Sequence, residues 1–198
     1  MDLILVRHGE TEDNLKGVYS GKSDGRLSKR GIEEIKMLKP IIDNFQIKTC
    51  ITSPLKRAIE TADILYDGEK IIDERIIEMN FGIFEGLKYE EALKQFPIEV
   101  NSWNDDFINY KIPEGESLLE VYRRCENFLN DIQKNSGNVL VISHGGVIRC
   151  ILSCVFGNPE FFYKFKIDNA SVSILEYSNG YYFLKGLNIK HCEGKCIE

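Results

Sequence analysis

The sequence predicts an α/β fold, a three-layer sandwich in which a mostly parallel central sheet is flanked by helices. Short apolar runs at residues 3–6 and within 138–143 are typical of strands that are buried on both faces of a parallel sheet. Segments with apolar residues three and four positions apart are typical of helices packed on such a sheet. Strands and helices alternate over most of the chain, which indicates a layered α/β class.

The chain of 198 residues is predicted to form a single domain over residues 1–198, because no linker rich in proline, glycine or serine divides it. Its end, from about 190 to 198, is expected to be mobile. No apolar run approaches the roughly 20 residues that span a bilayer, and the opening segment does not resemble a secretory signal, so we expect a cytoplasmic protein without a membrane partner. The net charge of −6 argues against nucleic-acid partners. The six cysteines are expected to be reduced.

The first part of the chain is predicted to contain two helices separated by a strand. Residues 28–45 form the first helix with Ser28 as its N-cap, although Pro40 is expected to kink or interrupt its last turns. Residues 50–53 form the strand. The second helix then starts with Ser53 as its N-cap and a proline in the first helical position, where the missing N–H costs nothing.

The middle of the chain carries weaker signals. Residues 70–87 are predicted as a strand or irregular segment that ends in a glycine-punctuated loop, and a short helix is expected over 89–96. Trp103, Phe107 and Tyr110 follow in an aromatic-rich connection. They either line a substrate entrance or pack a cap, and packing is the favoured interpretation.

The last third of the chain contains the clearest helix. Ser117 and Glu120 form a capping-box pattern, and apolar residues then repeat at helical spacing as far as Ile132. The strand within 138–143 is followed by a predicted helix that Gly157 ends. Two apolar runs joined by Ser-Asn-Gly predict a closing β-hairpin.

Polar side chains follow three of the predicted strands at the point where each strand ends. The pairs are Arg7–His8, Thr52–Ser53 and Ser143–His144. Ligands of open α/β sheets bind outside the carboxyl ends of the strands, so these groups are expected to converge. Gly145 follows His144 and lets the backbone approach a ligand. Arg57 lies in the first turns of a helix at the same edge, and a pocket with arginines, histidines and helix N-terminal N–H groups fits a phosphoryl group.

Four motifs in this order resemble the histidine phosphatase superfamily, also called the phosphoglycerate mutase-like family. The motifs are RHGETEDN from residue 7, SPLKRAIETA from residue 53, EMNFGIFEG from residue 78 and SHGG from residue 143. An RHG triplet alone is weak, whereas the ordered set is specific. The resemblance covers most of the chain and implies a phosphoglycerate mutase-like fold.

The resemblance also implies a role for each matching residue. His8 would be the nucleophile that forms a phosphohistidine, and Glu78 would protonate the leaving oxygen and later help to activate water. Asn14 would orient the pocket. The groups that would hold the phosphoryl oxygens are Arg7, Arg57 and His144. No metal and no cofactor is expected, because a neutral imidazole is a competent nucleophile near pH 7 and arginines stabilise the charge on the equatorial oxygens.

Several motifs have competing interpretations. Glu85 lies in the same loop as Glu78 and competes with it for the acid role. SGKS at residues 20–23 resembles the end of a P-loop, but Lys16 stands where the first glycine is required, so a nucleotide P-loop is rejected. Lys22 or Arg26 in this loop either contacts substrate at the mouth of the site or is simply solvated.

Two cysteine-containing features are predicted to be structural rather than metal-binding. The tail HCEGKC, residues 191–196, offers too few ligands at an unsuitable spacing for structural zinc. Cys150 and Cys154 share a helix face at an i, i+4 interval and are interpreted as packing residues.

These observations predict a metal-independent phosphatase that hydrolyses a small phosphorylated metabolite. Within the family, the length and the motifs EMNFGIFEG and PEGES most resemble α-ribazole phosphatases of cobalamin biosynthesis and related broad-range phosphatases, so α-ribazole 5′-phosphate is one expected substrate. A cofactor-dependent phosphoglycerate mutase is the alternative, although the chain lacks the insertions usual in mutases. A non-catalytic sensor of phosphorylated ligands is a third hypothesis. A homodimer is included among the assemblies that the sequence allows.

Overall fold

The computed structural model describes residues 1–190 and contains one six-stranded sheet, in the order β3-β2-β4-β1-β5-β6. The strands are β1 (Asp2–Arg7), β2 (Ile47–Thr52), β3 (Lys70–Ile72), β4 (Asn138–Ser143), β5 (Ser171–Ser178) and β6 (Tyr181–Ile189). The first four of these strands are parallel to one another, whereas β5 and β6 form an antiparallel hairpin against β1. The sheet is therefore mostly parallel, as predicted.

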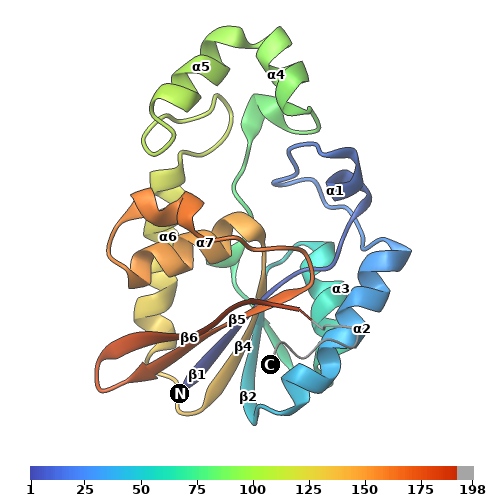
Figure 1. The fold of residues 1–198 in the computed structure, drawn as a ribbon, viewed down its shortest axis with the longest axis vertical. Coiled ribbons are helices and arrows are strands. Elements are labelled where there is room, and N and C mark those ends of the chain that lie inside the picture. The colour runs from blue at the N-terminus through green and yellow to red at the C-terminus, as the bar shows by residue number, and fades with distance from the viewer. Residues whose placement is uncertain (191–198) are drawn as a thin grey trace, which may run out of the picture.

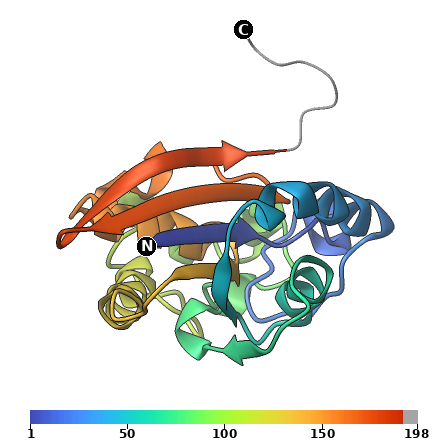
Figure 2. The ribbon, with the colours of Figure 1, turned by 90° about the horizontal axis from the view of Figure 1, so that it is seen from below.

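Helices cover both faces of the sheet, so the predicted three-layer sandwich is confirmed (Figures 1 and 2). The helices are α1 (Glu12–Lys16), α2 (Lys29–Asp43), α3 (Lys56–Leu65), α4 (Tyr89–Gln95), α5 (Pro97–Asp105), α6 (Leu118–Ile132) and α7 (Gly145–Val155). Short 3₁₀ helices are η1 (Glu74–Ile76), η2 (Gly82–Phe84) and η3 (Pro159–Lys164). Helices α2 and α3 lie on one side of the sheet and α6 and α7 on the other.

The alternation of side chains along β1 divides the core into two clusters. Leu3 and Leu5 belong to the cluster that α6 and α7 cover, and Ile4 and Val6 belong to the cluster that α2 and α3 cover. All four side chains are completely buried. A continuous apolar run is therefore required, because successive residues of a strand point to opposite faces and both faces are covered.

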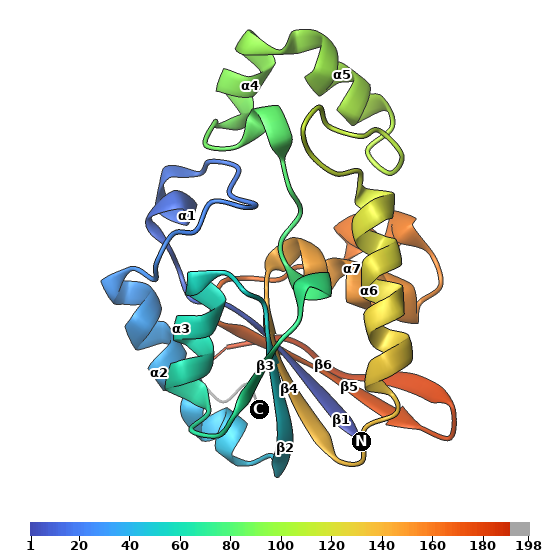
Figure 3. The ribbon, with the colours of Figure 1, turned by 180° about the vertical axis from the view of Figure 1, so that it is seen from behind.

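Helices α4 and α5 lie beyond one end of the sheet and outside its three layers (Figure 3). They are called the cap below. The short helix predicted over 89–96 corresponds to α4. The aromatic connection after it contains α5, which the sequence analysis missed, with Pro97 in its first turn. Pro97 follows the end of α4 almost directly. A proline at this place is compatible both with the end of one helix and with the start of the next, so the sequence does not distinguish them.

Two local predictions about helix boundaries are wrong. Pro40 does not interrupt α2, which continues to Asp43. Pro40 is exposed, so water can hydrate the Lys36 carbonyl that loses its helical donor. Helix α3 begins at Lys56 rather than at the proline, and Leu55 rather than Ser53 is its N-cap.

Other local signals are confirmed. Ser28 caps α2 by accepting from the Gly31 N–H at 3.0 Å, and the capping box at Ser117 is present. The hairpin turn between β5 and β6 places Asn179 and Gly180 at positive φ, and Gly157 follows α7 at a φ of 75°. Within residues 1–190, no helix is long and apolar enough to cross a membrane. The predictions about the tail, including HCEGKC, lie outside the described residues.

Candidate active site

The polar pairs at the strand ends converge, as the sequence predicted. Strands β1 and β4 pair in parallel with Arg7 opposite Ser143, and the His8 N–H donates to the Ser143 carbonyl at 3.0 Å. The Ser53 N–H donates to the carbonyl of Ile142 on β4 at 3.0 Å. Three segments far apart in the sequence thus end side by side at the edge of the sheet that faces the α4–α5 cap.

His8 lies in this cluster with one ring nitrogen engaged and one free of protein partners among the described residues. Its Nδ1 lies 2.7 Å from the Gly9 carbonyl oxygen, which can only accept, so Nδ1 carries the proton and Nε2 carries the lone pair. The side chain is 3% exposed. Burial lowers the pKa of His8 well below its usual value, and the positive charges of Arg57 and Arg7 add to this effect. The imidazole is therefore neutral at pH 7.

His144 is next to His8, with ring centroids 5.1 Å apart and the rings nearly edge to face. Its Nδ1 accepts from Nε of Arg57 at 3.3 Å, so the ring proton is on Nε2, which donates to the Ser53 hydroxyl at 2.7 Å. Burial lowers the pKa of His144, and the neighbouring His8 and Arg57 lower it further. Ser53 is thus a partner of His144 rather than the helix cap that the sequence indicated.

The guanidinium of Arg57 is buried between His144 and the loop at residues 20–23. It donates to the carbonyls of Gly21 at 2.8 Å and Ser20 at 3.2 Å, and also to the carbonyl of Ser23. It forms no ion pair with a carboxylate of residues 1–190. Burial lowers the pKa of Arg57, and the charge of Glu78 opposes this effect. One N–H on Nη1 remains available to a ligand, because four of the five guanidinium donors are used.

Arg7 carries the second guanidinium of the cluster and is partly buried. Its Nη1 donates to the Ile167 carbonyl at 2.7 Å, and its Nε is buried with no hydrogen-bond partner in the described structure. Gly145 packs against it: a Cβ at Gly145 would approach Nε and Cζ of Arg7 to 3.2 Å. Gly145 therefore allows the guanidinium to lie flat against the start of α7.

Glu78 lies on the other side of the cluster and is 9% exposed. One carboxylate oxygen accepts from the Gly146 N–H at 3.1 Å, and the other accepts from the Met79 N–H at 3.0 Å. The side chain lines a cavity of about 240 Å³ together with Gly146 at the start of α7. A buried carboxylate therefore faces an open space beside the two histidines and two arginines.

Glu85, the competing carboxylate, has a different environment. Its oxygens accept from the N–H groups of Gly21 at 3.0 Å, Lys22 at 3.1 Å and Phe81 at 3.0 Å, and it does not line the cavity. Gly21 is pressed so closely against this region that a Cβ would lie 1.9 Å from the Met79 carbonyl oxygen. Glu85 thus holds the loop at 20–23 in the position from which its carbonyls bind Arg57.

The loop at 20–23 presents carbonyls, not N–H groups, to the site, which agrees with the rejection of a P-loop. The residues that were considered as substrate contacts in this loop are exposed, and Arg26 pairs with Glu60 at 3.6 Å. Within residues 1–190, no group of three or more side chains is arranged to hold a metal ion. The described cysteines are free thiols, and Cys150 and Cys154 pack in the core on α7.

Asn14 reaches the site through a residue that the sequence analysis missed. Its Oδ1 accepts from Nδ2 of Asn169 at 2.9 Å, and the same Nδ2 lies 3.3 Å from the His8 carbonyl oxygen. Asn14 also accepts from the Thr11 N–H at 3.1 Å. Asn14 thus supports the backbone at His8. No sequence pattern marked Asn169, which lies 161 residues from His8 in a loop before β5.

Half of the residues that line the cavity beside Glu78 are aromatic, and they come from the cap, from η3 and from two loops. Its aromatic lining is Tyr19, Phe81, Trp103, Phe107, Phe162 and Tyr163. Trp103 and Phe107 therefore line the cavity and also belong to the packing of the cap, whereas Tyr110 only packs. Arg149 lines the same cavity and was not singled out by the sequence analysis.

Comparison with known proteins agrees with this fold. The model of the histidine phosphatase superfamily (branch 1) matches residues 3–190. Phosphoserine phosphatase 1 of Hydrogenobacter thermophilus is 34% identical, over 94% of this chain and 92% of that protein. The adenosylcobalamin/alpha-ribazole phosphatase of Escherichia coli is 28% identical, over 95% of this chain and 96% of that protein.

Among solved structures, the alpha-ribazole phosphatase from Shigella flexneri superposes with a TM-score of 0.89 and 28% identity, over 99% of this chain and 100% of that chain. The fold and these relatives define a phosphatase that hydrolyses phosphate esters. The chain belongs to the histidine phosphatase superfamily.

Proposed function

We propose that the protein hydrolyses a small phosphomonoester through a phosphohistidine on His8, without a metal ion. The observation that carries this proposal is the unprotonated Nε2 of a buried, neutral imidazole beside two guanidinium groups that have no carboxylate partner in the described structure. A nucleophile in a cationic pocket is what phosphoryl transfer requires, because the transferred group carries negative charge on its equatorial oxygens.

In the first step, Nε2 of His8 attacks phosphorus and the bond to the leaving oxygen breaks. Glu78 donates its proton to that oxygen and becomes a carboxylate. The proton of His8 stays on Nδ1, which donates to the Gly9 carbonyl throughout, so the ring keeps its orientation. Arg7 and Arg57 stabilise the charge of the transferred group, and His144 holds Arg57 through its Nδ1.

In the second step, water attacks the phosphohistidine and Glu78 accepts the proton that water loses. The N–P bond breaks, phosphate leaves, and His8 and Glu78 return to their starting forms. The cavity beside Glu78 supplies the route for the leaving alcohol and for water. Asn14 and Gly145 act by positioning the His8 backbone and the Arg7 side chain.

Two observations each support a different natural substrate. The aromatic lining of the cavity supports α-ribazole 5′-phosphate, whose leaving group carries a benzimidazole ring. The more similar relative is named a phosphoserine phosphatase, which supports O-phosphoserine. A phosphoglycerate mutase would use the same nucleophile and differ in delivering the phosphoryl group to a second substrate hydroxyl, so it is the alternative function. The cytoplasmic location and the homodimer stay predictions from the sequence.

The test is phosphate release from a panel that contains p-nitrophenyl phosphate, α-ribazole 5′-phosphate, O-phospho-L-serine and 3-phosphoglycerate with a bisphosphoglycerate primer. We expect stoichiometric release of phosphate and an acid-labile, base-stable phosphoenzyme that the His8→Ala variant cannot form. Isomerisation of 3-phosphoglycerate without net phosphate release would overturn the phosphatase proposal in favour of the mutase. Binding of phosphate esters without turnover of any of them would favour the sensor.

A further inference from the structure

Arg149 is a third, partly buried arginine near the site, and none of the steps above uses it. It lies on α7, one turn after the Gly146 that donates to Glu78, and it lines the same cavity as Glu78. Its charge lowers the pKa of Arg7 and opposes the rise in the pKa of Tyr163, so Arg149 lies near both groups.

No hydrogen bond from the side chain of Arg149 is found among residues 1–190. Its Nε is buried without a hydrogen-bond partner, and no carboxylate within residues 1–190 pairs with it. The guanidinium carbon lies 5.4 Å from the centroid of the Phe162 ring. Stacking on an aromatic face restrains the plane of the guanidinium and leaves its edge open to a ligand. A buried N–H donor without a partner is costly, and an anionic acceptor that reaches Nε would remove this cost.

The position of Arg149 indicates that it would contact the leaving group of the substrate. Phosphoryl transfer is in line, so the leaving oxygen and the attacking nitrogen lie on opposite sides of phosphorus. Glu78, which would protonate the leaving oxygen, lines the cavity, whereas His8, Arg7, Arg57 and His144 do not. Arg149 therefore faces the departing alcohol.

The rest of the cavity limits the charge and size of that alcohol. Among the described residues, Arg149 is the only basic side chain that lines the cavity. Its single positive charge can balance a singly charged group of the alcohol, but not the double charge of a second phosphoryl group. The volume of about 240 Å³ is below the roughly 300–1,000 Å³ of clefts that hold drug-sized ligands. A guanidinium edge binds a carboxylate with two parallel hydrogen bonds.

We propose that Arg149 determines specificity by binding a carboxylate of the leaving group, so that the natural substrate is the phosphate monoester of a small hydroxy acid. This inference rests on the proposed phosphatase function and narrows it. It favours esters such as O-phosphoserine over α-ribazole 5′-phosphate, which has no carboxylate.

The test compares two substrates that differ only in the carboxylate, O-phospho-L-serine and O-phosphoethanolamine, in the parent protein and in Arg149→Gln. We expect kcat/KM for O-phospho-L-serine to fall roughly 10- to 100-fold, as for the loss of one charge-assisted pair, while kcat/KM for O-phosphoethanolamine changes less than about 3-fold. Arg149→Lys should restore part of the difference because it keeps the charge. Arg123→Gln, an exposed arginine on α6, is the matched control and should change neither substrate.

Equal losses on both substrates would overturn the inference, because they would make Arg149 a ligand of the phosphoryl group or a purely structural residue. Equal kcat/KM values for the two substrates in the parent protein would also overturn it. Both results leave the phosphatase proposal intact. If the parent protein also fails to hydrolyse p-nitrophenyl phosphate, the proposed function itself is wrong. Thermal unfolding of each variant checks that it is folded, and Arg149→Lys provides the comparison if Arg149→Gln is not.

Discussion

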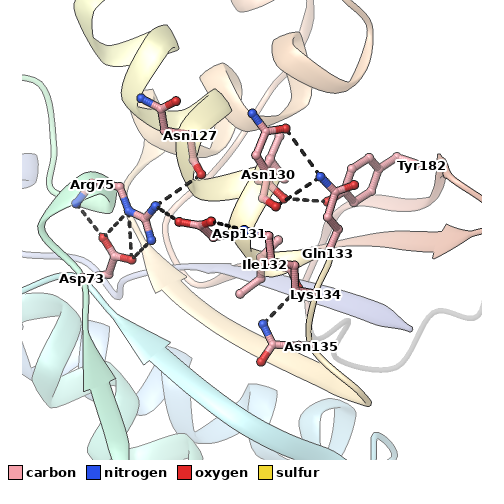
Figure 4. Close-up of polar contacts among 11 residues, drawn as sticks. Asp73, Arg75, Asn127, Asn130, Asp131, Ile132, Gln133, Lys134, Asn135 and Tyr182 are labelled. Carbon is pink, nitrogen blue, oxygen red and sulfur yellow. Dashed lines mark hydrogen bonds and ion pairs between the residues drawn. The ribbon is translucent and has the colours of Figure 1, made fainter.

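Arg75 and the arginines of the active site show two ways in which one protein uses a guanidinium. Arg75 lies on η1 and donates to both oxygens of Asp73, to Asp131 at 2.6 Å and to the Asn127 carbonyl at 3.2 Å, so that η1 is attached to α6 (Figure 4). These bonds raise the pKa of Arg75. Arg7 and Arg57 have only carbonyl and imidazole partners in residues 1–190, and burial lowers their pKa values.

The difference lies in which negative charge neutralises the arginine. Asp73 and Asp131 neutralise the charge of Arg75 within the protein, so it has no uncompensated charge to offer an anionic ligand. The active-site arginines are held in place by neutral carbonyls, which orient a guanidinium without cancelling its charge. A cluster of uncompensated buried cations is costly in the empty protein and becomes favourable when a phosphoryl group enters.

The largest expected effect comes from removing the nucleophile. We expect His8→Ala to lower kcat on phosphate esters by at least about 10⁴-fold, because no other imidazole nitrogen in the described cluster is free to attack. Steady-state phosphate release measures this. Arg75→Ala is the control and should retain kcat within about 2-fold. A His8→Ala enzyme with substantial turnover would contradict the assignment of the nucleophile.

The loss of activity on removing the proposed acid, Glu78, should depend on the leaving group of the substrate. Glu78→Gln cannot donate a carboxylic proton, but its amide oxygen can still accept from the Gly146 N–H, so one of the two backbone contacts of Glu78 is kept. We expect kcat on an alkyl phosphate to fall roughly 10²- to 10⁴-fold. Hydrolysis of p-nitrophenyl phosphate should be much less affected in its first step, because that leaving group needs little protonation. Equal losses on both esters would argue against an acid role.

Loosening the support of Arg57 should have a smaller effect. Glu85→Ala leaves three backbone N–H groups without their acceptor, so the loop at 20–23 no longer holds Arg57 firmly. We expect kcat to fall roughly 10-fold, with Glu85→Gln closer to the parent because one amide oxygen remains as acceptor. Retention of full activity by Glu85→Ala would show that Arg57 does not need this loop.

The buried histidines should make stability depend on pH. His8 and His144 both have pKa values below the usual 6.5, so the unfolded state binds more protons than the folded state once the pH falls below about 6.5. Stability is therefore fully present above this pH and is lost as the pH falls towards the lowered values. Two such groups give a slope of up to about 2.7 kcal/mol per pH unit.

Urea unfolding between pH 7.5 and 5.0 measures this slope, and His8→Asn should reduce it by about half because one titrating ring is removed. An unchanged slope in His8→Asn would contradict a neutral, buried His8. The window ends at pH 5.0 because carboxylates contribute below it.

The smallest expected effect is on stability and comes from removing the structural arginine, Arg75. Arg75→Ala should lower the free energy of unfolding by about 1 kcal/mol, since the side chain is about one-third exposed and its ion pairs are partly screened. Asp73→Asn should have a similar effect. Urea unfolding checks both, and a drop in kcat of more than a few fold would show that η1 and α6 are coupled to the site.

Local signals predicted those elements whose cause is local. The capping box at Ser117 and the turn at Asn179 depend on neighbours within a few residues, so their signatures can be recognised in the sequence. The predictions for Ser53 and Pro40 failed because the structure at these residues depends on distant parts of the chain. The Ser53 hydroxyl makes its shorter hydrogen bond, of 2.7 Å, with His144, 91 residues away, and a longer one, of 3.4 Å, with the nearby Leu55 N–H. The exposure of Pro40 depends on how α2 packs.

The sequence by itself determined the α/β class, the superfamily and the identity of His8, Arg7, Arg57, His144 and Glu78 as the group to examine, because short motifs carry these residues at strand and helix ends. Only the tertiary structure decided what each side chain contacts. The free Nε2 of His8, the clamping of the 20–23 loop by Glu85 and the unpaired Arg149 depend on contacts between distant segments. Such contacts leave no periodic or local pattern, since a hydrogen bond across the fold requires a position in space and not a spacing along the chain.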